Sequence, residues 1–242
     1  MNKCFPFNKG FSNEKDLLFC FHHAGGSATQ FRSWLEYISL IDVVPVELPG
    51  KATRRAEKYV ESMAELVPHL AHAIAGICTN KRIYLFGHSM GAIIAYQVAH
   101  YLEKELKIKP RLLIAAARQA PQAPSMDRYT SAKGFDILLE ELRWLNGTPN
   151  IILENKNIQE IILPEIRREY ILNESYVYAG EKISCDICVH YGKEDPDLTE
   201  GALLGWRDVT TGSVDIKAYG GDHFFVYSHL KEYIESLGPL LV

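Results

Sequence analysis

Six short runs of apolar residues recur along the chain, and between them lie segments whose apolar positions follow a helical period. The apolar runs are rich in β-branched and aromatic residues, and they are continuous rather than alternating. This pattern is typical of strands that are buried on both faces of a parallel sheet. The six predicted strands cover residues 17–21, 43–48, 83–86, 112–116, 187–191 and 214–219.

Amphipathic helices are predicted between the strands. In residues 31–38, 63–74 and 93–102 the apolar side chains recur at helical spacing, which gives each helix one face toward a core. Strands that alternate with helices favour a doubly wound α/β sheet, mostly parallel and twisted, with helices on both faces.

Residues 121–180 interrupt this alternation. They carry two or three helical segments, at 135–145, 151–162 and 166–178, with no convincing strand between them. Helices inserted after a core strand of such a sheet lie over the carboxyl ends of the strands, where an open α/β sheet has its ligand crevice. We therefore expect residues 121–180 to form a helical lid over a site. An ordinary packed helical layer is the alternative.

Composition and charge favour one domain and exclude some partners. A chain of 242 residues with 47% hydrophobic side chains can bury one large core, and no composition shift marks a linker, so residues 1–242 are treated as a single domain. The formal net charge is −4 with both signs interspersed, which gives no basic field for nucleic acid or anionic lipid. No run approaches the roughly 18 apolar residues of a membrane span, and residues 1–15 lack the pattern of a secretory signal. We expect a cytoplasmic protein, monomeric by default, with no nucleic-acid or membrane partner.

The cysteines predict neither a disulfide framework nor a metal site. Cys4, Cys20, Cys78, Cys185 and Cys188 are odd in number, irregularly spaced and mostly inside apolar runs. Cys185 and Cys188 form a C-x-x-C, which could be half of a zinc site or a redox pair, but no second pair of ligands completes it. We expect five reduced, mostly buried thiols and no metal.

The candidate chemistry begins with Gly87-His88-Ser89-Met90-Gly91. This G-x-S-x-G follows the predicted strand 83–86 directly and precedes a predicted helix. In that context the serine sits on a sharp turn from strand to helix, and glycines two residues before and after it remove side chains that would clash. The motif predicts an α/β-hydrolase fold with Ser89 as its nucleophile.

A serine nucleophile needs a histidine base, and in this fold the chain order is serine, acid, histidine. Four histidines follow Ser89 in the sequence. His100 belongs to the next helix, His190 lies inside a strand pattern, and His229 follows His223 at helical spacing. Only His223 comes directly after a strand, in a loop that opens with two glycines. We therefore predict His223 as the base.

The acid is expected in the loop after strand 187–191, which reads Gly-Lys-Glu-Asp-Pro-Asp. Asp195 is favoured because Pro196 restricts it to an extended conformation. Asp197 and Glu194 remain alternatives. Asp222 is disfavoured, because its side chain would point away from the neighbouring imidazole.

A glycine-rich turn after the first strand, His22-His23-Ala24-Gly25-Gly26-Ser27, can supply a backbone N–H for the oxyanion of a tetrahedral intermediate. The second donor is the N–H of the residue after the nucleophile. The predicted oxyanion-hole donors are the N–H groups of Ala24 and Met90. A metal site at His22 and His23 is disfavoured, because adjacent strand residues point to opposite faces.

With these residues assembled, the chain resembles the type II thioesterases that accompany bacterial modular polyketide and nonribosomal peptide synthases. The resemblance spans nearly the whole chain. It lies in seven ordered patches, at residues 23–27, 48–50, 86–92, 147–149, 195–196, 205–206 and 220–225. In that family the acid precedes a proline in this loop, which further favours Asp195.

The resemblance implies the substrate and the partner. Such enzymes hydrolyse acyl groups from the 4′-phosphopantetheine arm of acyl or peptidyl carrier proteins, and they clear wrongly loaded or stalled carriers. The enzyme itself would need no cofactor. The inserted helices would cover a channel for the arm and its acyl group, and a mobile apolar lid suits such a substrate better than a tight polar pocket.

This chain departs from the family's common pattern at three places. The family commonly has proline where His22 stands, arginine where Lys51 stands, and Gly-Arg-Arg where Ala117-Arg118-Gln119 stands. None of these belongs to the predicted triad. They leave open whether the rim contacts to carrier protein or phosphate are the usual ones, since lysine and arginine bind phosphate differently.

Three other functions are compatible with the same motifs. A carboxylesterase or lipase would cleave small oxygen esters with the same triad. An acyltransferase would pass the acyl group to an alcohol or amine instead of water. A non-catalytic module that binds carrier proteins is disfavoured by the complete set of triad residues.

Overall fold

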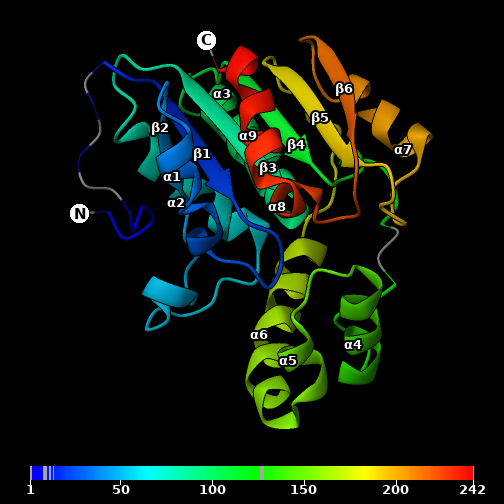
Figure 1. Cartoon of the computed structure of the whole chain (residues 1–242). Coiled ribbons are helices and arrows are strands. Elements are labelled where there is room, and N and C mark those ends of the chain that lie inside the picture. The colour runs from blue at the N-terminus through cyan, green and yellow to red at the C-terminus, as the bar shows by residue number, and fades with distance from the viewer. Residues whose placement is uncertain (1, 8–9, 11, 13, 126–127, 242) are drawn as a thin grey trace.

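The computed structural model describes residues 2–7, 10, 12, 14–125 and 128–241. Six parallel strands form one twisted sheet in the order β2-β1-β3-β4-β5-β6 (Figure 1). The strands are β1 (Leu17–Phe21), β2 (Asp42–Pro45), β3 (Ile83–His88), β4 (Leu112–Ala116), β5 (Asp186–Gly192) and β6 (Val214–Tyr219). The predicted mostly parallel α/β fold is confirmed.

The strand order reverses between β1 and β3. The chain runs outward from β1 to β2, and then returns across β1 to place β3 on its other side. In open α/β sheets such a switch point leaves a crevice outside the carboxyl ends of the two strands, because the following loops diverge. The loops after β1 and β3 therefore border the expected site.

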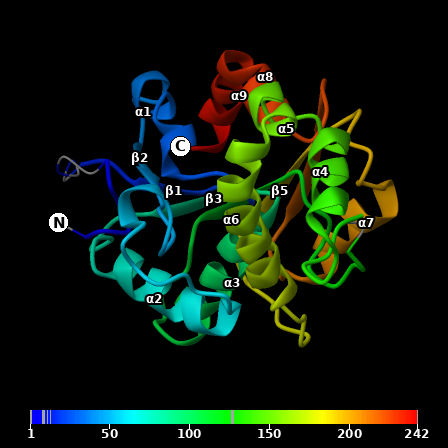
Figure 2. The ribbon, with the colours of Figure 1, turned by 90° about the horizontal axis from the view of Figure 1, so that it is seen from below.

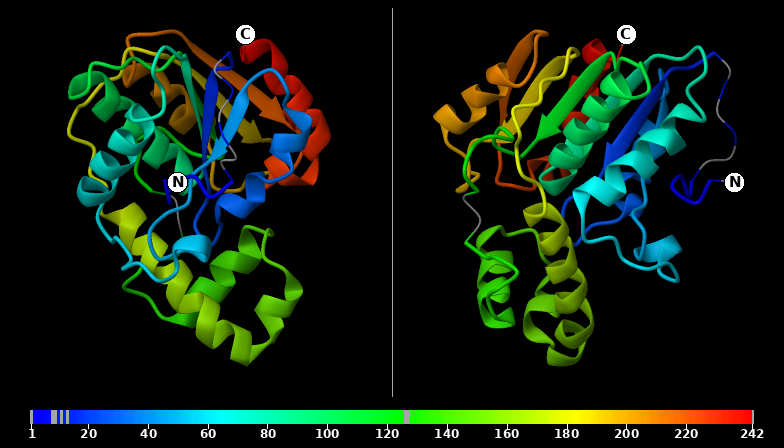
Figure 3. Two further views of the ribbon diagram at one scale, coloured as in Figure 1. Left: turned by 90° about the vertical axis from the view of Figure 1, so that its left-hand side faces the viewer. Right: turned by 180° about the vertical axis from the view of Figure 1, so that it is seen from behind.

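Two layers of helices bury the two faces of the sheet. Along β1, Leu17, Phe19 and Phe21 belong to one core cluster, whereas Leu18 and Cys20 belong to the other. The continuous apolar run thus reflects a strand that is covered on both sides. Figure 3 shows the covering layers from two sides. The helices of these layers are α1 (Trp34–Tyr37), α2 (Met63–Ala75), α3 (Met90–Lys104), α7 (Glu200–Leu204), α8 (Phe225–Ser228) and α9 (Leu230–Leu237).

Two sequence-based boundaries in the first fifty residues were wrong. The strand predicted at 43–48 ends at Pro45, because the Glu47 N–H donates to the carbonyl of Cys4 and the chain leaves the sheet. The helix predicted at 31–38 is divided into a 3-10 turn, Ala28–Phe31, and the short helix α1. Ser27 begins the first turn by accepting the N–H of Thr29, and the extended backbone of Ile38 ends the helix.

The inserted segment forms three helices that lie at the carboxyl ends of the strands (Figures 1 and 2). These are α4 (Phe135–Trp144), α5 (Asn150–Glu154) and α6 (Lys156–Glu174), and the described residues between 121 and 180 contain no strand. The helices share a small core of their own, made by Tyr129, Leu138, Leu142, Leu163, Ile166 and Tyr170. The insertion therefore packs as a unit at the place predicted for a lid.

The predicted break between helical segments 151–162 and 166–178 was wrong. α6 begins after Asn155, whose side-chain oxygen accepts the N–H groups of Asn157 and Ile158, and it continues through Pro164. A proline inside a helix removes one hydrogen bond and favours a kink. Here Leu163 and Ile166, on either side of Pro164, are buried in the core of the insertion, and this packing keeps the helix continuous.

Within the described residues, no helix combines the length and the apolar composition that crossing a membrane would require.

Candidate functional site

Ser89 occupies the turn between β3 and α3. Its backbone has φ 55° and ψ −117°, a conformation that residues with a side chain rarely adopt. The N–H of Ser89 donates to the carbonyl of Ala116 at 2.8 Å. The anchored, strained turn projects the side chain from the carboxyl edge of the sheet into a cavity that it shares with His223. This is the geometry that the G-x-S-x-G motif predicts.

The two glycines of the motif are required by close backbone contacts. A Cβ at Gly87 would overlap the backbone of Gly91 and Ala92, and one at Gly91 would overlap the carbonyl groups of Phe21 and His22. Helix α3 therefore starts against the end of β1, so the nucleophile and the turn after β1 lie close together.

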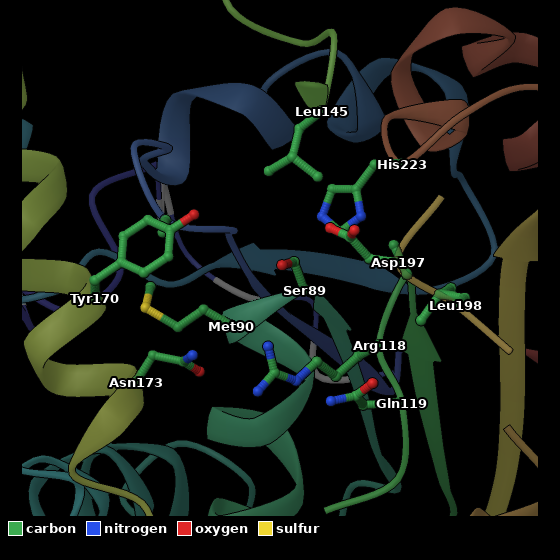
Figure 4. Close-up of a pocket in the computed structure, with 12 residues that line it drawn as sticks. Ser89, Met90, Arg118, Gln119, Leu145, Tyr170, Asn173, Asp197, Leu198 and His223 are labelled. Carbon is green, nitrogen blue, oxygen red and sulfur yellow. The ribbon is translucent and has the colours of Figure 1, made fainter. Parts of the chain in front are cut away.

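Asp195 and His223 form a hydrogen-bonded pair beside the serine. His223 Nδ1 lies 2.8 Å from Asp195 Oδ2, and the two residues are 7% and 6% exposed. An ionised carboxylate only accepts hydrogen bonds, so Nδ1 donates, which leaves Nε2 of the neutral ring to accept a proton. Figure 4 shows the imidazole in the same pocket as Ser89.

The loops that carry this pair are joined through their backbones. The N–H of Glu194 donates to the carbonyl of Gly221 at 3.0 Å. A Cβ at Gly192 would overlap the carbonyl groups of Gly221 and Asp222, so only glycine permits this approach. The neighbouring parallel strands β5 and β6 thus bring residues 195 and 223 together.

The alternative acids have different surroundings. Asp197 donates its N–H to Asp195 Oδ1 at 3.1 Å and accepts the indole N–H of Trp144 at 3.1 Å, so it supports Asp195 and contacts helix α4. Glu194 is exposed. Asp222 accepts an amide N–H of Asn146.

The alternative histidines lie elsewhere. His190 is buried in β5, where its ring lies 2.9 Å from the hydroxyl of Tyr233, His100 is part of α3, and His229 is exposed. The structure therefore brings together Ser89, Asp195 and His223 and leaves the alternatives outside this arrangement.

The two residues predicted to supply the oxyanion donors line the same cavity. Ala24 and Met90 line it together with Ser89 and His223. In the turn after β1, the N–H of Gly26 donates to the carbonyl of His23 at 3.0 Å, and the N–H of Gly25 donates to Glu169 Oε2 at 2.6 Å. The two amides that follow Ala24 in the turn are therefore held by other groups of the protein.

Sequence reasoning missed two histidines that support His223. His88 Nε2 donates to the carbonyl of His223 at 2.8 Å, and His88 Nδ1 lies 3.2 Å from His23 Nδ1. Burial lowers the pKa of His88 to about 3, so its ring is neutral at physiological pH. A histidine inside the G-x-S-x-G motif was the available signal, because a polar ring there needs partners.

Two adjoining cavities meet at Ser89 and His223. The larger, about 150 Å³, extends beneath the insertion, and the smaller is about 40 Å³. The insertion contributes mainly apolar side chains to the larger cavity, among them Leu142, Leu145, Pro149, Ile152, Ile162 and Ile166, and the polar residues His23, Gln30 and His223 also line it. The smaller includes Arg118, Gln119, Asn173 and Asp197, of which Asn173 belongs to α6 (Figure 4). The insertion thus forms part of the site's wall.

The described residues include no cluster of three or more potential metal ligands. All five cysteines are free and buried, Cys185 and Cys188 included. Burial raises the pKa of Cys185 to about 12 and that of Cys188 to about 11, so neither is poised as a thiolate. The prediction that this C-x-x-C is structural agrees with these surroundings.

Comparison with known proteins gives a consistent result. The family model of the thioesterase domain matches residues 17–241. The protein named linear gramicidin dehydrogenase LgrE, from Brevibacillus parabrevis, is 36% identical over 221 residues, which are 89% of this chain and 84% of the relative. Gramicidin S biosynthesis protein GrsT, from Aneurinibacillus migulanus, is 33% identical over 237 residues, covering 97% of this chain and 92% of the relative. Among solved structures, the type II thioesterase BorB of the borrelidin biosynthetic cluster superposes with a TM-score of 0.83 at 30% identity, covering 97% and 96% of the two chains.

Proposed function

Because the chain belongs to the thioesterase family, we propose that it hydrolyses acyl thioesters on the 4′-phosphopantetheine arm of acyl or peptidyl carrier proteins. The observation that carries this proposal is the Asp195–His223 hydrogen bond of 2.8 Å next to Ser89 in its strained turn, at the switch point of the sheet. Such a pair converts a weakly nucleophilic hydroxyl into an effective one. In this proposal the enzyme needs no cofactor of its own, since the pantetheine belongs to the substrate.

The reaction follows from the positions of these groups. Ser89 Oγ attacks the thioester carbonyl carbon while His223 Nε2 takes the hydroxyl proton, and Asp195 stabilises the imidazolium that forms. The N–H groups of Ala24 and Met90 bind the oxyanion. When the tetrahedral intermediate collapses, the carbon–sulfur bond breaks and the sulfur receives the proton from His223.

The second half of the reaction repeats the proton transfers with water. His223 removes a proton from a water molecule, the hydroxide attacks the acyl-serine carbonyl, and the bond to Ser89 Oγ breaks. The serine oxygen recovers its proton from His223. The products are a free carboxylic acid and the thiol of the carrier arm.

A role in clearing blocked carriers is supported by the similar proteins. The names of the relatives and solved structures refer to gramicidin biosynthesis and to the borrelidin cluster, in which BorB is called a type II thioesterase. We infer that this chain removes aberrant or stalled acyl groups from carriers of a modular polyketide or nonribosomal peptide synthase. A cavity with an apolar wall beneath the insertion suits acyl groups of varied structure.

Dehydrogenase activity, which the name of the Brevibacillus relative suggests for that protein, is not supported in this chain. Dinucleotide binding by an α/β sheet commonly uses a G-x-G-x-x-G turn, which lets the backbone approach the pyrophosphate. No two glycines in this sequence have the G-x-G spacing.

The test is mass spectrometry of a panel of acylated carrier proteins incubated with the enzyme. We expect conversion of acyl carriers to free-thiol carriers and free acids, and no conversion above background by Ser89→Ala. Full activity of Ser89→Ala would refute every covalent version of the mechanism.

Oxygen esterase activity and acyl transfer are resolved by two additional measurements. The first compares kcat/KM for acyl-pantetheine thioesters with kcat/KM for p-nitrophenyl esters of the same acyl chain. A strong preference for the oxygen esters would refute the proposed substrate. Product analysis in the presence of alcohols and amines would reveal transfer as an ester or amide product.

A further inference from the structure

Three segments that are far apart in the sequence meet at the turn after β1. Glu169 of α6 directs Oε2 toward this turn, where it accepts the N–H of Gly25 at 2.6 Å. The same oxygen accepts a hydrogen bond from Lys51 Nζ, in the loop after β2, at 3.0 Å. The side chains of Glu169 and Lys51 are only 2% and 6% exposed.

Further polar groups enclose this pair. His22 Nδ1 donates to the carbonyl of His23 at 2.8 Å, and the same nitrogen lies 3.9 Å from Glu169 Oε1. On the other side of the ring, His22 Nε2 lies 3.9 Å from Glu47 Oε1. Burial lowers the pKa of His22 to about 3, so a neutral imidazole separates the two carboxyl groups.

A buried ion pair contributes little net free energy to the packing of a helix. Removing a carboxylate and an ammonium from water costs free energy that their attraction recovers only in part, and apolar side chains commonly pack as stably. The desolvation is visible at Glu169, whose pKa burial raises to about 7 against the opposing effects of Lys51 and the Gly25 N–H. The pair therefore suggests a role in fixing geometry.

The ion pair fixes the geometry of the turn after β1, which includes the proposed oxyanion donor Ala24 and is called the oxyanion turn below. Gly25 has a positive φ of 85°, and a Cβ there would lie 3.4 Å from Ile166 Cγ1, which also belongs to α6. The helix thus contacts this residue through two side chains one turn apart. Holding the Gly25 N–H fixes the peptide plane that follows Ala24, and so restricts rotation of the residue whose N–H is the proposed oxyanion donor.

We propose that Glu169 is a positioning residue that links the seating of lid helix α6 to the formation of the oxyanion hole. Its carboxylate is held by Lys51 and holds the Gly25 N–H, so the Ala24 N–H points into the cavity only while α6 is seated. This inference rests on the function proposed above. It assigns Glu169 no contact with the reacting atoms.

The experiment compares two double variants that both lack the ion pair. Lys51→Met/Glu169→Gln keeps an oxygen that can accept the Gly25 N–H, whereas Lys51→Met/Glu169→Leu replaces it with an apolar group of similar size. Displacement of a catalytic group by about 1 Å can cost roughly a hundredfold in rate. We expect kcat of the Leu variant to be about tenfold to a hundredfold below that of the Gln variant, with KM values within about twofold, because only the transition state carries the oxyanion.

Equal kcat values in the two double variants would overturn the proposal, because a role in packing alone does not distinguish an amide oxygen from a methyl group. Thermal unfolding of both variants provides the control for stability.

A second readout separates this inference from the proposed function. A fluorophosphonate reacts with an activated serine by forming an oxygen–phosphorus bond and releasing fluoride, and its phosphoryl oxygen occupies the oxyanion hole whatever the natural substrate is. We expect intact mass spectrometry to show slower labelling of the Leu variant than of the Gln variant. If the labelling rates differ while wild-type enzyme hydrolyses no thioester, the proposed substrate is wrong and the positioning role stands.

Hydrogen exchange of the wild-type Gly25 amide tests the contact without any variant. Gly25 is itself exposed, so protection of its N–H would have to come from the bond to Glu169. We expect exchange at least about a hundredfold slower than in an unstructured peptide. Exchange at the unstructured rate would overturn the proposal even if the Leu variant failed to fold.

Discussion

At the scale of single residues, the site depends on a backbone conformation that opposes stability. Ser89, at φ 55° and ψ −117°, occupies a region that costs on the order of 1–3 kcal/mol for a residue with a side chain. The conformation persists because the Ser89 N–H bonds to Ala116 and because α3 starts against the end of β1. The molecule thereby gives up stability in return for a fixed position of the hydroxyl.

Replacing Ser89 by glycine and by alanine separates the strain from the chemistry. Both variants lack the hydroxyl, and we expect kcat to fall by a factor of about 10⁴ to 10⁶ in each. Only glycine adopts the observed φ without strain, so Ser89→Gly should be more stable than Ser89→Ala by about 1 kcal/mol in urea unfolding. Equal stabilities would show that the turn is unstrained.

The carboxylate of Asp195 orients the imidazole of His223. In Asp195→Asn the side-chain amide can donate to the ring and stabilise the wrong tautomer, so we expect kcat to fall by a factor of about 10³ to 10⁴ with folding retained. Asp197→Asn is the matched control, since it keeps the backbone N–H that bonds to Asp195 Oδ1. We expect kcat of Asp197→Asn to fall by less than about tenfold. If kcat fell further in Asp197→Asn than in Asp195→Asn, Asp197 would be the acid of the triad.

At the scale of elements, the insertion contacts the catalytic loop as well as the oxyanion turn. Gly147, between α4 and α5, lies so close to Phe224 that a Cβ would overlap its ring. The Phe224 ring packs edge-on against His23, with centroids 4.9 Å apart, and against His223 at 5.2 Å. A shift of the insertion would therefore displace Phe224 and, through its ring, both His23 and His223.

Adding one methyl group at this contact tests that transmission. In Gly147→Ala either Phe224 or the α4–α5 loop has to move, and we expect kcat/KM to fall by about tenfold. Gly201→Ala provides the control, because a Cβ at this position of α7 has no atom of the described residues within 4 Å. Unchanged kinetics in Gly147→Ala would show that the loop yields without disturbing His223.

The sequence predicted the elements of the sheet well and those of the insertion less well. Apolar runs located all six strands, and in β1, β3 and β4 burial on both faces left a local signature. The edge strand β6 differs, because its residues alternate between half-buried and exposed over most of its length. The course of α6 through Pro164 could not be predicted, since the packing that keeps it continuous comes from Leu138 and Leu142 of another helix. Local pattern predicts an element only where local preference and tertiary packing agree.

At the scale of the whole molecule, the parallel sheet brings distant residues to one edge. That Ser89, Asp195 and His223 lie at one edge could be predicted because each follows a strand, and the carboxyl ends of parallel strands share that edge. The cluster of His22, Glu47, Lys51 and Glu169 could not, because its members come from three separate segments. A charged Glu47 within an apolar run was one signal of a buried polar partner.

The buried histidines determine how stability depends on pH. Burial lowers the pKa values of His22, His88 and His190 to about 3, against an ordinary value of 6.5. Between these values the unfolded chain binds protons that the folded chain does not, so stability is fully present above pH 6.5 and is lost as the pH falls toward 3. Glu169, whose pKa burial raises to about 7, has the opposite effect, because its folded form binds a proton that the unfolded chain releases. The effect of this one group on stability is smaller than that of the three histidines together.

We therefore expect the free energy of unfolding in urea to decrease steadily from pH 7 to pH 4. His229→Gln, at an exposed position, should leave this slope unchanged. A stability that is flat or rises over this range would mean that the three rings are protonated in the folded protein.

The burial of all five thiols makes the protein suited to a simple colorimetric assay. Hydrolysis of a thioester releases one free sulfhydryl per turnover, which a disulfide reagent such as dithionitrobenzoate converts to a coloured product. Because the enzyme's own sulfur atoms are enclosed and largely protonated, the folded catalyst adds little background colour. The same reagent added in denaturant would titrate five groups per chain, so one chemistry measures both turnover and the fraction of enzyme that is folded.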